Sequence, residues 1–163
     1  MLRAERSSSV RGAHGEALLV LIDEVLREAS IPLAALTGIV VGRGPGSFTG
    51  IRVALATALG LRRACPSLPI ATVTTFEALA HGHEGTFVVT VPALPGEVYA
   101  ERWQDGAPLG EPTVLAEDTL TPGEKRVQAT LDLRSLWRAS RGKPASAELL
   151  PCYVAPPKIT APK

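Results

Sequence analysis

The sequence predicts an α/β fold in which amphipathic helices alternate with short apolar strands. Helices are indicated over residues 15–29 and 49–64, where apolar side chains recur every three or four positions. Short segments rich in β-branched residues, 38–42 and 70–73, are typical of buried strands in such sheets. Because each helix is followed by a strand along the chain, the order favours the α/β class.

The first helix carries a broad apolar stripe. Its side chains include Leu18, Leu19, Ile22 and Leu26, and the stripe is wider than the roughly 100° that a surface helix needs to cover its own core. The helix is expected to end before Pro32, because the residue that precedes a proline avoids helical backbone angles.

The second half of the chain is richer in strands. We expect Thr75 to cap a short helix over 76–80, and the polar loop 81–85 to separate this helix from the strands after it. The other expected elements are a short strand over 2–10, strands over 86–91, 96–103 and 113–115, and a helix over 131–141. The sequence thus predicts an α/β unit over residues 1–82, a smaller β-rich unit over 83–154 and a proline-rich tail over 155–163.

Composition and charge exclude several classes of protein. With 45% hydrophobic residues and a net charge of +1 over 163 residues, the chain is neither disordered nor a strongly basic nucleic-acid binder. An aromatic content of 4% argues against base-stacking platforms. No apolar run approaches the roughly 20 residues of a membrane span, and the first residues lack the apolar core of a signal peptide, so we expect a cytoplasmic protein. Cys65 and Cys152 match neither a disulfide framework nor metal-ligand spacing.

Charge is unevenly distributed along the chain. Residues 1–124 carry nine basic and 14 acidic side chains, whereas residues 125–163 carry eight basic and two acidic ones. Contact with RNA, contact with an acidic partner and a merely solvated basic face all remain open.

The most informative segment is a glycine-rich loop between strand 38–42 and helix 49–64. Its candidate site residues are Gly42, Gly44, Pro45, Gly46, Ser47, Phe48 and Thr49. Glycines permit a sharp turn and can leave backbone amides free to bind an anion. The loop matches neither the Walker phosphate loop nor the dinucleotide fingerprint, so phosphate binding and a structural turn both remain open. We expect Gly46 to occupy backbone angles that are costly for a β-branched residue.

Several segments resemble the bacterial TsaB (YeaZ) family. The resemblance is strongest in the run from Val41 to Arg52, which contains the glycine-rich loop, and in Val-Thr-Thr-Phe-Glu-Ala-Leu-Ala at 73–80. Shorter matches lie within 14–23, 96–100 and 151–154. The resemblance is close over residues 10–104 and thin over the rest.

The resemblance implies an actin-like, sugar-kinase-type fold (ASKHA, ribonuclease H-like), with a mixed sheet covered by helices. Residues 1–10 resemble only the end of the family's first strand hairpin, so we expect either a reduced version without the rest of this hairpin or a misassigned start. The implied role is that of a non-catalytic subunit in the threonylcarbamoyl modification of adenosine in tRNA. Its implied partners are a TsaD-like catalytic paralogue and a TsaE-like ATPase, with a homodimer in isolation and tRNA reached only through the complex. No cofactor of its own is implied, apart from weak nucleotide binding at an interface shared with the partner.

The positions of the family's metal site support a non-catalytic role. In the catalytic paralogue, two histidines one helical turn apart bind the metal, and the resemblance aligns them with Thr75 and Leu79. Leucine has no lone pair to offer a metal ion. The spacing of His81 and His83 is a weak metal signal that a solvated loop explains. We therefore predict neither catalytic residues nor a metal site.

Both helices are candidates for a partner interface. Small residues at Gly50, Ala54 and Ala58 recur every four positions of the second helix, so that another backbone could approach closely. This pattern alone is equally consistent with helices that cover their own sheet. With the resemblance, the predicted interface comprises Leu18, Leu19, Ile22, Leu26, Gly50, Ala54 and Ala58.

Three functions remain open at this point. The first is the non-catalytic partner in tRNA modification. The second is a nucleotide-binding enzyme of the same fold, kinase-like or glycoprotease-like, and the third is a structural protein that uses the fold to self-associate. The absence of metal-ligating side chains at the aligned positions argues against the second.

Overall fold

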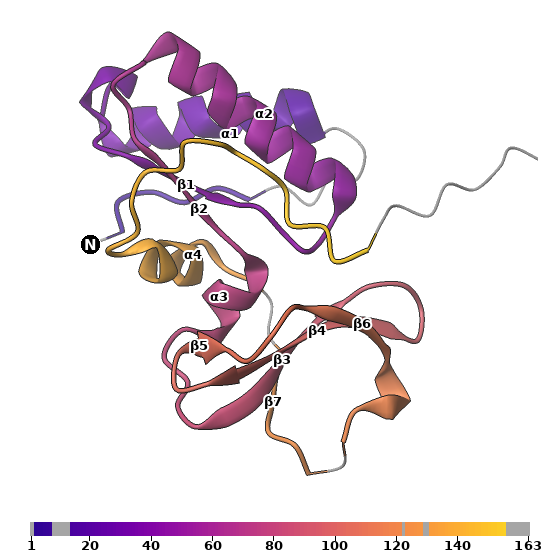
Figure 1. Cartoon of the computed structure of the whole chain (residues 1–163). Helices are drawn as coiled ribbons and strands as arrows, with labels where there is room; N and C mark the ends of the chain where they lie inside the picture. Colours follow the sequence, from indigo (N-terminus) through magenta and orange to yellow (C-terminus); the bar gives the residue numbers. More distant parts are fainter. Residues whose placement is uncertain (1, 8–13, 122, 129–130, 156–163) are drawn as a thin grey trace, which may run out of the picture.

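The computed structural model describes residues 2–7, 14–121, 123–128 and 131–155 (Figure 1). Its helices are α1 (His14–Ala29), α2 (Phe48–Ala64), α3 (Thr75–Ala80) and α4 (Leu133–Ser140), with the 3-10 helices η1 (Leu33–Ala35) and η2 (Glu117–Thr119). Its strands are β1 (Ile39–Gly42), β2 (Ile70–Val73), β3 (Thr86–Pro92), β4 (Glu97–Gln104), β5 (Ala107–Pro108), β6 (Thr113–Ala116) and β7 (Arg126–Val127). No helix among the described residues is long and apolar enough to cross a membrane.

Strands β1 and β2 form a parallel pair that is covered on both faces. Ile39 lies opposite Ile70 in the register. Neighbouring residues of a strand point to opposite faces, and accordingly Val41 packs with α2 while Val40 packs with α4. Figure 1 shows α2 and α4 on opposite sides of this pair, with α1 lying alongside α2. The alternation of helix and strand predicted between residues 15 and 80 is confirmed, and each helix begins one residue earlier than predicted.

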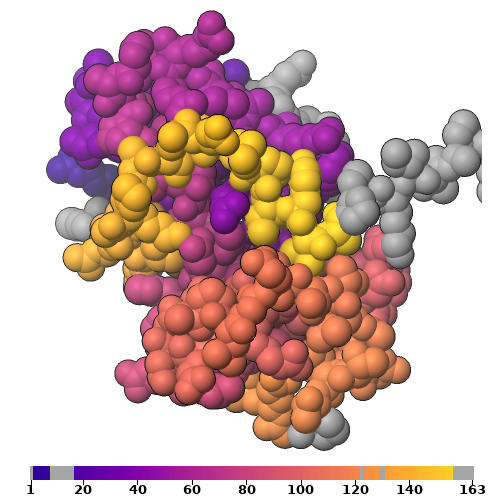
Figure 2. All heavy atoms as spheres, in the orientation of Figure 1, coloured from indigo at the N-terminus to yellow at the C-terminus, as the bar shows by residue number. Residues whose placement is uncertain are grey.

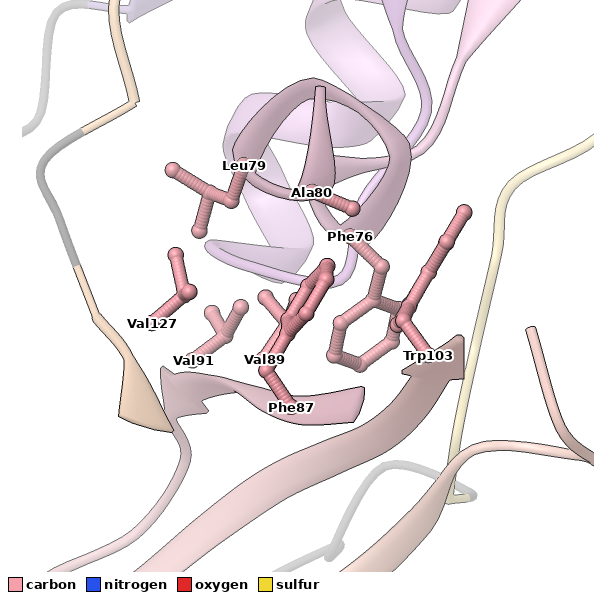
Figure 3. Close-up of a cluster of buried hydrophobic side chains, with 8 residues drawn as sticks. All are labelled: Phe76, Leu79, Ala80, Phe87, Val89, Val91, Trp103 and Val127. Carbon is pink, nitrogen blue, oxygen red and sulfur yellow. The ribbon is translucent and has the colours of Figure 1, made fainter. Parts of the chain in front are cut away.

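The second sheet is mixed and is built around β3 and β4. Its order is β5-β4-β3-β7, and β6 pairs with the same strand β4. β3 and β4 run antiparallel over their whole length, whereas β7 joins β3 in parallel. Helix α3 covers one face, where a core of aromatic and aliphatic side chains forms (Figure 3): Phe76, Leu79, Ala80, Phe87, Val89, Val91, Trp103 and Val127. The predicted mixed sheet with packed helices is therefore confirmed, but its strands separate into two sheets.

The chain returns to the first unit after the second sheet. Ser146 N donates to Ile70 O at 2.7 Å, and Leu149 enters the core between β1, β2 and α2. The yellow segment of Figure 2 runs across the first unit in this way. Residues 131–154 belong to the predicted second unit, but α4 and Leu149 pack on the first unit, whereas Val154 packs against the core of the second sheet. The domain boundaries remain a prediction.

Local signals account for most differences between expected and observed elements. Thr74, not Thr75, caps α3: its Oγ1 accepts from Glu77 N at 3.0 Å, and Glu77 Oε2 accepts from Thr74 N at 2.7 Å. This reciprocal capping box is legible in the spacing Thr-x-x-Glu. The two-residue strands β5 and β7 carry no periodicity, so the sequence could not indicate them. Residues 2–7 form no strand, and the rest of the predicted strand, like residues 156–163 of the tail, lies outside the described residues.

Candidate functional site

The glycine-rich loop connects the end of β1 to the start of α2. Gly42 ends β1 and Phe48 begins α2. Ser47 caps the helix, because its Oγ accepts a hydrogen bond from Gly50 N at 3.2 Å. Such a cap satisfies one of the amides that a helix start leaves unpaired. The loop therefore serves first as a strand-to-helix connection, with Thr49 exposed in the opening turn.

Gly44 is the position in the loop at which the backbone requires a glycine. Its φ is +95°, and a Cβ built there would lie 2.6 Å from Ile51 Cδ1 and 3.1 Å from Cys152 O. Gly46, for which the sequence predicts strained backbone angles, is exposed and has open space around the Cβ position. Its φ of +159° is close to extended backbone, so the expectation for Gly46 is replaced by a stronger constraint at Gly44.

Three segments that are distant in sequence meet at this loop. Thr75 N donates to Gly44 O at 2.8 Å, and Thr75 Oγ1 donates to Pro45 O at 2.6 Å. From the other side, Cys152 N donates to Arg43 O at 2.7 Å. The loop thus turns three consecutive carbonyl oxygens towards its own chain. This arrangement favours the structural interpretation, while phosphate binding by the loop stays a prediction.

An aromatic cluster fastens the C-terminal segment to the start of α2. The rings of Phe48 and Tyr153 lie 5.3 Å apart, and the Arg52 guanidinium lies 3.9 Å from the Phe48 ring centroid. Arg52 Nε also donates to the Tyr153 hydroxyl at 3.2 Å. The sequence singled out 151–154 only through the family resemblance, because no periodicity marks a segment that runs across a surface.

The side chains at the aligned metal positions are used in packing. Thr75 and Leu79 lie one turn apart on α3 and are both buried. Thr75 Oγ1 holds the glycine-rich loop, and Leu79 belongs to the core of Figure 3. His81 and His83 are exposed, and the His83 ring lies 5.5 Å from that of Phe87. Within the described ranges no three histidine, cysteine or acidic side chains are grouped as a metal site would require.

Two glutamates with shifted pKa values flank the loop. Burial by itself would raise the pKa of Glu77, but hydrogen bonds from Lys143 and Thr74 outweigh it and hold the pKa below its usual range. Burial raises the pKa of Glu101, against a hydrogen bond that the Trp103 indole donates at 2.8 Å. Glu77 is thereby kept ionised as the link between α3 and the segment after α4.

Cys152 is a poor candidate for a nucleophile. Burial raises the pKa of its thiol, although the nearby Arg43 guanidinium acts in the opposite direction. The thiolate is the reactive form of cysteine, so the site holds Cys152 in its less reactive state. The contribution of Cys152 to the site is its backbone amide, which supports the loop.

Helix α1 itself covers much of the predicted small-residue stripe of α2. Gly50 and Ala54 line a shallow cavity together with Ala17, Leu18 and Leu21 of α1. The small side chains therefore allow the chain's own α1 to approach. Ala58, the third predicted position, is 2% exposed and lies in the core beneath α2, so a partner cannot reach it while this fold holds.

The outer face of α1 exposes two apolar side chains beside charged ones such as Asp23 and Arg27. Leu19 is 55% exposed and Val20, which was not among the predicted residues, is 57% exposed. Leu18, Ile22 and Leu26 are partly buried. The predicted interface residues thus divide into a group that packs inside the molecule and a smaller group that remains accessible.

Comparison with known proteins gives a family match over most of the chain. A family model described as TsaD, tRNA N6-adenosine threonylcarbamoyltransferase, matches residues 8–118. An uncharacterized protein of Mycobacterium leprae is 34% identical over 120 residues, covering 74% of this chain and 33% of that protein. The tRNA threonylcarbamoyladenosine biosynthesis protein TsaB of Haemophilus influenzae is 37% identical over 90 residues, covering 53% of this chain and 38% of that protein.

A solved structure shows similarity over a larger share of both chains. YeaZ from Pseudomonas aeruginosa is similar with a TM-score of 0.65 and 26% identity, covering 86% of this chain and 84% of the other. By contrast, the chain spans only about a third of the length of the M. leprae and H. influenzae relatives.

Proposed function

Because the chain belongs to the TsaD family of tRNA N6-adenosine threonylcarbamoyltransferases, we propose that it is a non-catalytic, TsaB-like subunit in threonylcarbamoyl modification of tRNA. The resemblance to the TsaB (YeaZ) family is confirmed by the relatives from H. influenzae and P. aeruginosa, and with it the actin-like fold. The proposal concerns what the chain contributes to the modification.

The observation that carries the proposal is the environment of Thr75 and Leu79. A metal site at this turn of α3 would need two imidazoles facing one ion. Instead, one side chain holds the glycine-rich loop and the other fills the core against Phe87 and Val127. Histidines at these two positions would remove contacts on which the fold depends. This supports a non-catalytic subunit in which the turn serves packing.

The proposed partner is a TsaD-like catalytic paralogue that docks on the outer face of α1. Leu19 and Val20 supply exposed apolar area there. Self-association through the same face gives a homodimer when the paralogue is absent, and a TsaE-like ATPase joins the assembled complex. The complex acts in the cytoplasm on tRNA.

The proposal includes only weak binding of a nucleotide, at the interface that the chain shares with its TsaD-like partner. The amides at the start of α2 can contribute to weak nucleotide binding there, because a helix start is favourable for anions. The carbonyl groups of the glycine-rich loop are engaged within the chain. The proposal therefore assigns this chain no cofactor of its own.

Co-expression with the TsaD-like protein of the same organism tests the proposal. Light scattering of the purified mixture is expected to show a heterodimer for the wild type and for the control Leu109→Ser, which alters an equally exposed leucine of the second sheet. Leu19→Ser/Val20→Ser is expected to abolish the heterodimer without changing the circular dichroism spectrum. A double variant that still forms the heterodimer would refute the docking face.

The same experiment separates the alternative functions. Failure of the wild type to associate with the TsaD-like protein, together with a stable homodimer, would favour a self-associating structural protein. Modification of tRNA by the purified chain alone would favour an enzyme of the same fold. Each outcome contradicts the proposed subunit.

A further inference from the structure

Helix α4 presents an outer arc that combines apolar and basic side chains. Its inner side packs Leu136 and Ala139 against β1, β2 and α3. At 100° per residue, the opposite side collects five exposed side chains, which we call the α4 outer arc. Its members are Leu133, Arg134, Trp137, Arg138 and Arg141.

An exposed tryptophan lies at the centre of this arc. Trp137 is 58% exposed and Leu133, one turn before it, is 57% exposed. The Arg141 guanidinium carbon lies 5.6 Å from the centroid of the Trp137 ring. The sequence contains only two tryptophans, and the other, Trp103, is buried and hydrogen-bonded to Glu101. A chain poor in aromatic residues thus exposes one of them beside a guanidinium.

The surrounding structure leaves most of the charge of the arc's arginines uncompensated, although Asp132 interacts electrostatically with Arg138. Arg134, Arg138 and Arg141 take part in no ion pair within the part of the chain that is described. Asp132 is already used as the helix cap, where its Oδ1 accepts from Ser135 N at 2.6 Å. The arc therefore carries a positive potential, although the whole chain is close to neutral.

We propose that the α4 outer arc contacts the tRNA directly, with Trp137 stacking on an unpaired base and the three arginines facing phosphates. The proposal rests on the proposed function and adds to it a surface of this chain that touches the substrate. Aromatic rings with arginines beside them are the elements that recognise single-stranded nucleic acid. An apolar protein surface is the weaker occupant, since it would bury three guanidinium groups without a charge partner, whereas phosphates supply one for each.

The contact is expected to be weak and sensitive to salt. Binding that depends on a few arginines has a dissociation constant of roughly 1–100 μM at physiological salt. Each phosphate contact contributes about one unit to the slope of log K against log salt concentration. Such an affinity suits a surface that adds to the grip of a larger complex.

Tryptophan fluorescence offers a direct probe. Titration of the purified chain with an unmodified tRNA transcript at about 50 mM salt, where phosphate contacts are least screened, is expected to quench Trp137 and leave the buried Trp103 unchanged. The same titration in the Trp103→Phe variant isolates the signal of Trp137. Anisotropy of labelled tRNA gives the affinity independently.

Variants separate stacking from general attraction. Trp137→Ala and Trp137→Leu are both expected to weaken binding about fivefold or more, whereas Trp137→Phe keeps most of it, because only an aromatic face can stack. Arg134→Gln/Arg138→Gln is expected to lower the salt slope by about two units. Arg3→Gln/Arg63→Gln, which changes two exposed arginines outside the arc, serves as the matched control and should leave the slope unaltered.

Two results would overturn the inference. One is the absence of tRNA binding, or binding that the arc variants do not change. The other is equal binding of polyglutamate with no dependence on residue 137, which would assign the arc to an acidic protein. Heterodimer formation with the TsaD-like protein is measured on the same variants and reports on the proposed function separately. The docking face lies on α1, which packs on α2, and α2 and α4 cover opposite faces of the β1–β2 pair (Figure 1).

Discussion

Helices α2 and α4 cover opposite faces of the same strand pair, yet they use their apolar side chains differently. α2 buries Ile51, Leu55 and Ala58, and its small residues Gly50 and Ala54 allow α1 to approach. α4 buries only Leu136 and leaves Leu133 and Trp137 exposed. The difference teaches that a stripe of small residues can be covered by another helix of the same chain. The apolar side chains Leu133 and Trp137, which lie among arginines on a short helix, remain exposed to a binding partner.

The largest effect is expected from Ala58→Glu. This substitution places a carboxylate in the core between α2, β1 and β2, where no partner can reach it. Removing a charge from water without pairing costs several kcal/mol, which is comparable to the whole stability of a small domain. Circular dichroism should therefore show an unfolded chain. A folded Ala58→Glu variant that has lost only its partner would mean that Ala58 faces outwards, as the interface prediction based on the family resemblance required.

The next effect concerns the turn that starts α2. Gly44→Ala adds a Cβ at a φ of +95° and 2.6 Å from Ile51 Cδ1, so strain and overpacking together should cost about 2–5 kcal/mol. Gly46→Ala, at the exposed position two residues later, is the matched control and should cost far less. Urea unfolding curves measure both. Equal losses would show that the loop does not depend on the close approach at Gly44.

Two leucines of α4 sharpen the comparison within a single helix. Leu136→Ala removes a buried side chain and should cost about 2–3 kcal/mol, whereas Leu133→Ala, at a 57% exposed position, should change stability by no more than about 0.5 kcal/mol. Both variants introduce the same residue with the same helix propensity. Comparable losses in urea unfolding would place Leu133 in a packed environment and remove the basis for the α4 outer arc.

The smallest effect is tied to pH. Because the folded pKa of Glu77 is lower than its usual value of 4.5, its ion pair with Lys143 stabilises the fold above that pH and is lost as the pH falls through the folded pKa. Glu77→Gln keeps the capping geometry but not the charge, and should cost about 1 kcal/mol at neutral pH. The variant should also lose part of the decline in stability below pH 4.5. Identical pH profiles would show that the pair contributes nothing.

In the first unit, the sequence predicted the helices and strands better than it predicted the contacts between them. Periodicity placed α1 and α2, and short runs of apolar, β-branched residues placed β1 and β2, each within one residue of its observed bounds. It could not show that the extended segment after α4 returns to the first unit, since a segment that crosses a surface has no period.

The candidate site was likewise predicted only in part, because its contacts join segments that are distant in sequence. The glycine-rich loop was identified from its residues, and the segment 73–80 from the family resemblance. Which glycine is constrained depends on Cys152, which is distant in sequence. Likewise, the positions at which Ala54 and Ala58 face α1 or the sheet depend on how the helices pack. Residue types were enough to identify these segments, but which of their residues are constrained or buried depends on tertiary contacts.

The central claim is that this chain assists a catalyst without being one. The most direct test is transfer of the threonylcarbamoyl group to unmodified tRNA, measured with this chain alone, with the TsaD-like protein and TsaE-like ATPase alone, and with all three together. The account predicts no transfer by the chain alone and a rate for the three proteins well above that for the two without it. Transfer by the chain alone, or a rate that its addition leaves unchanged, would contradict the account.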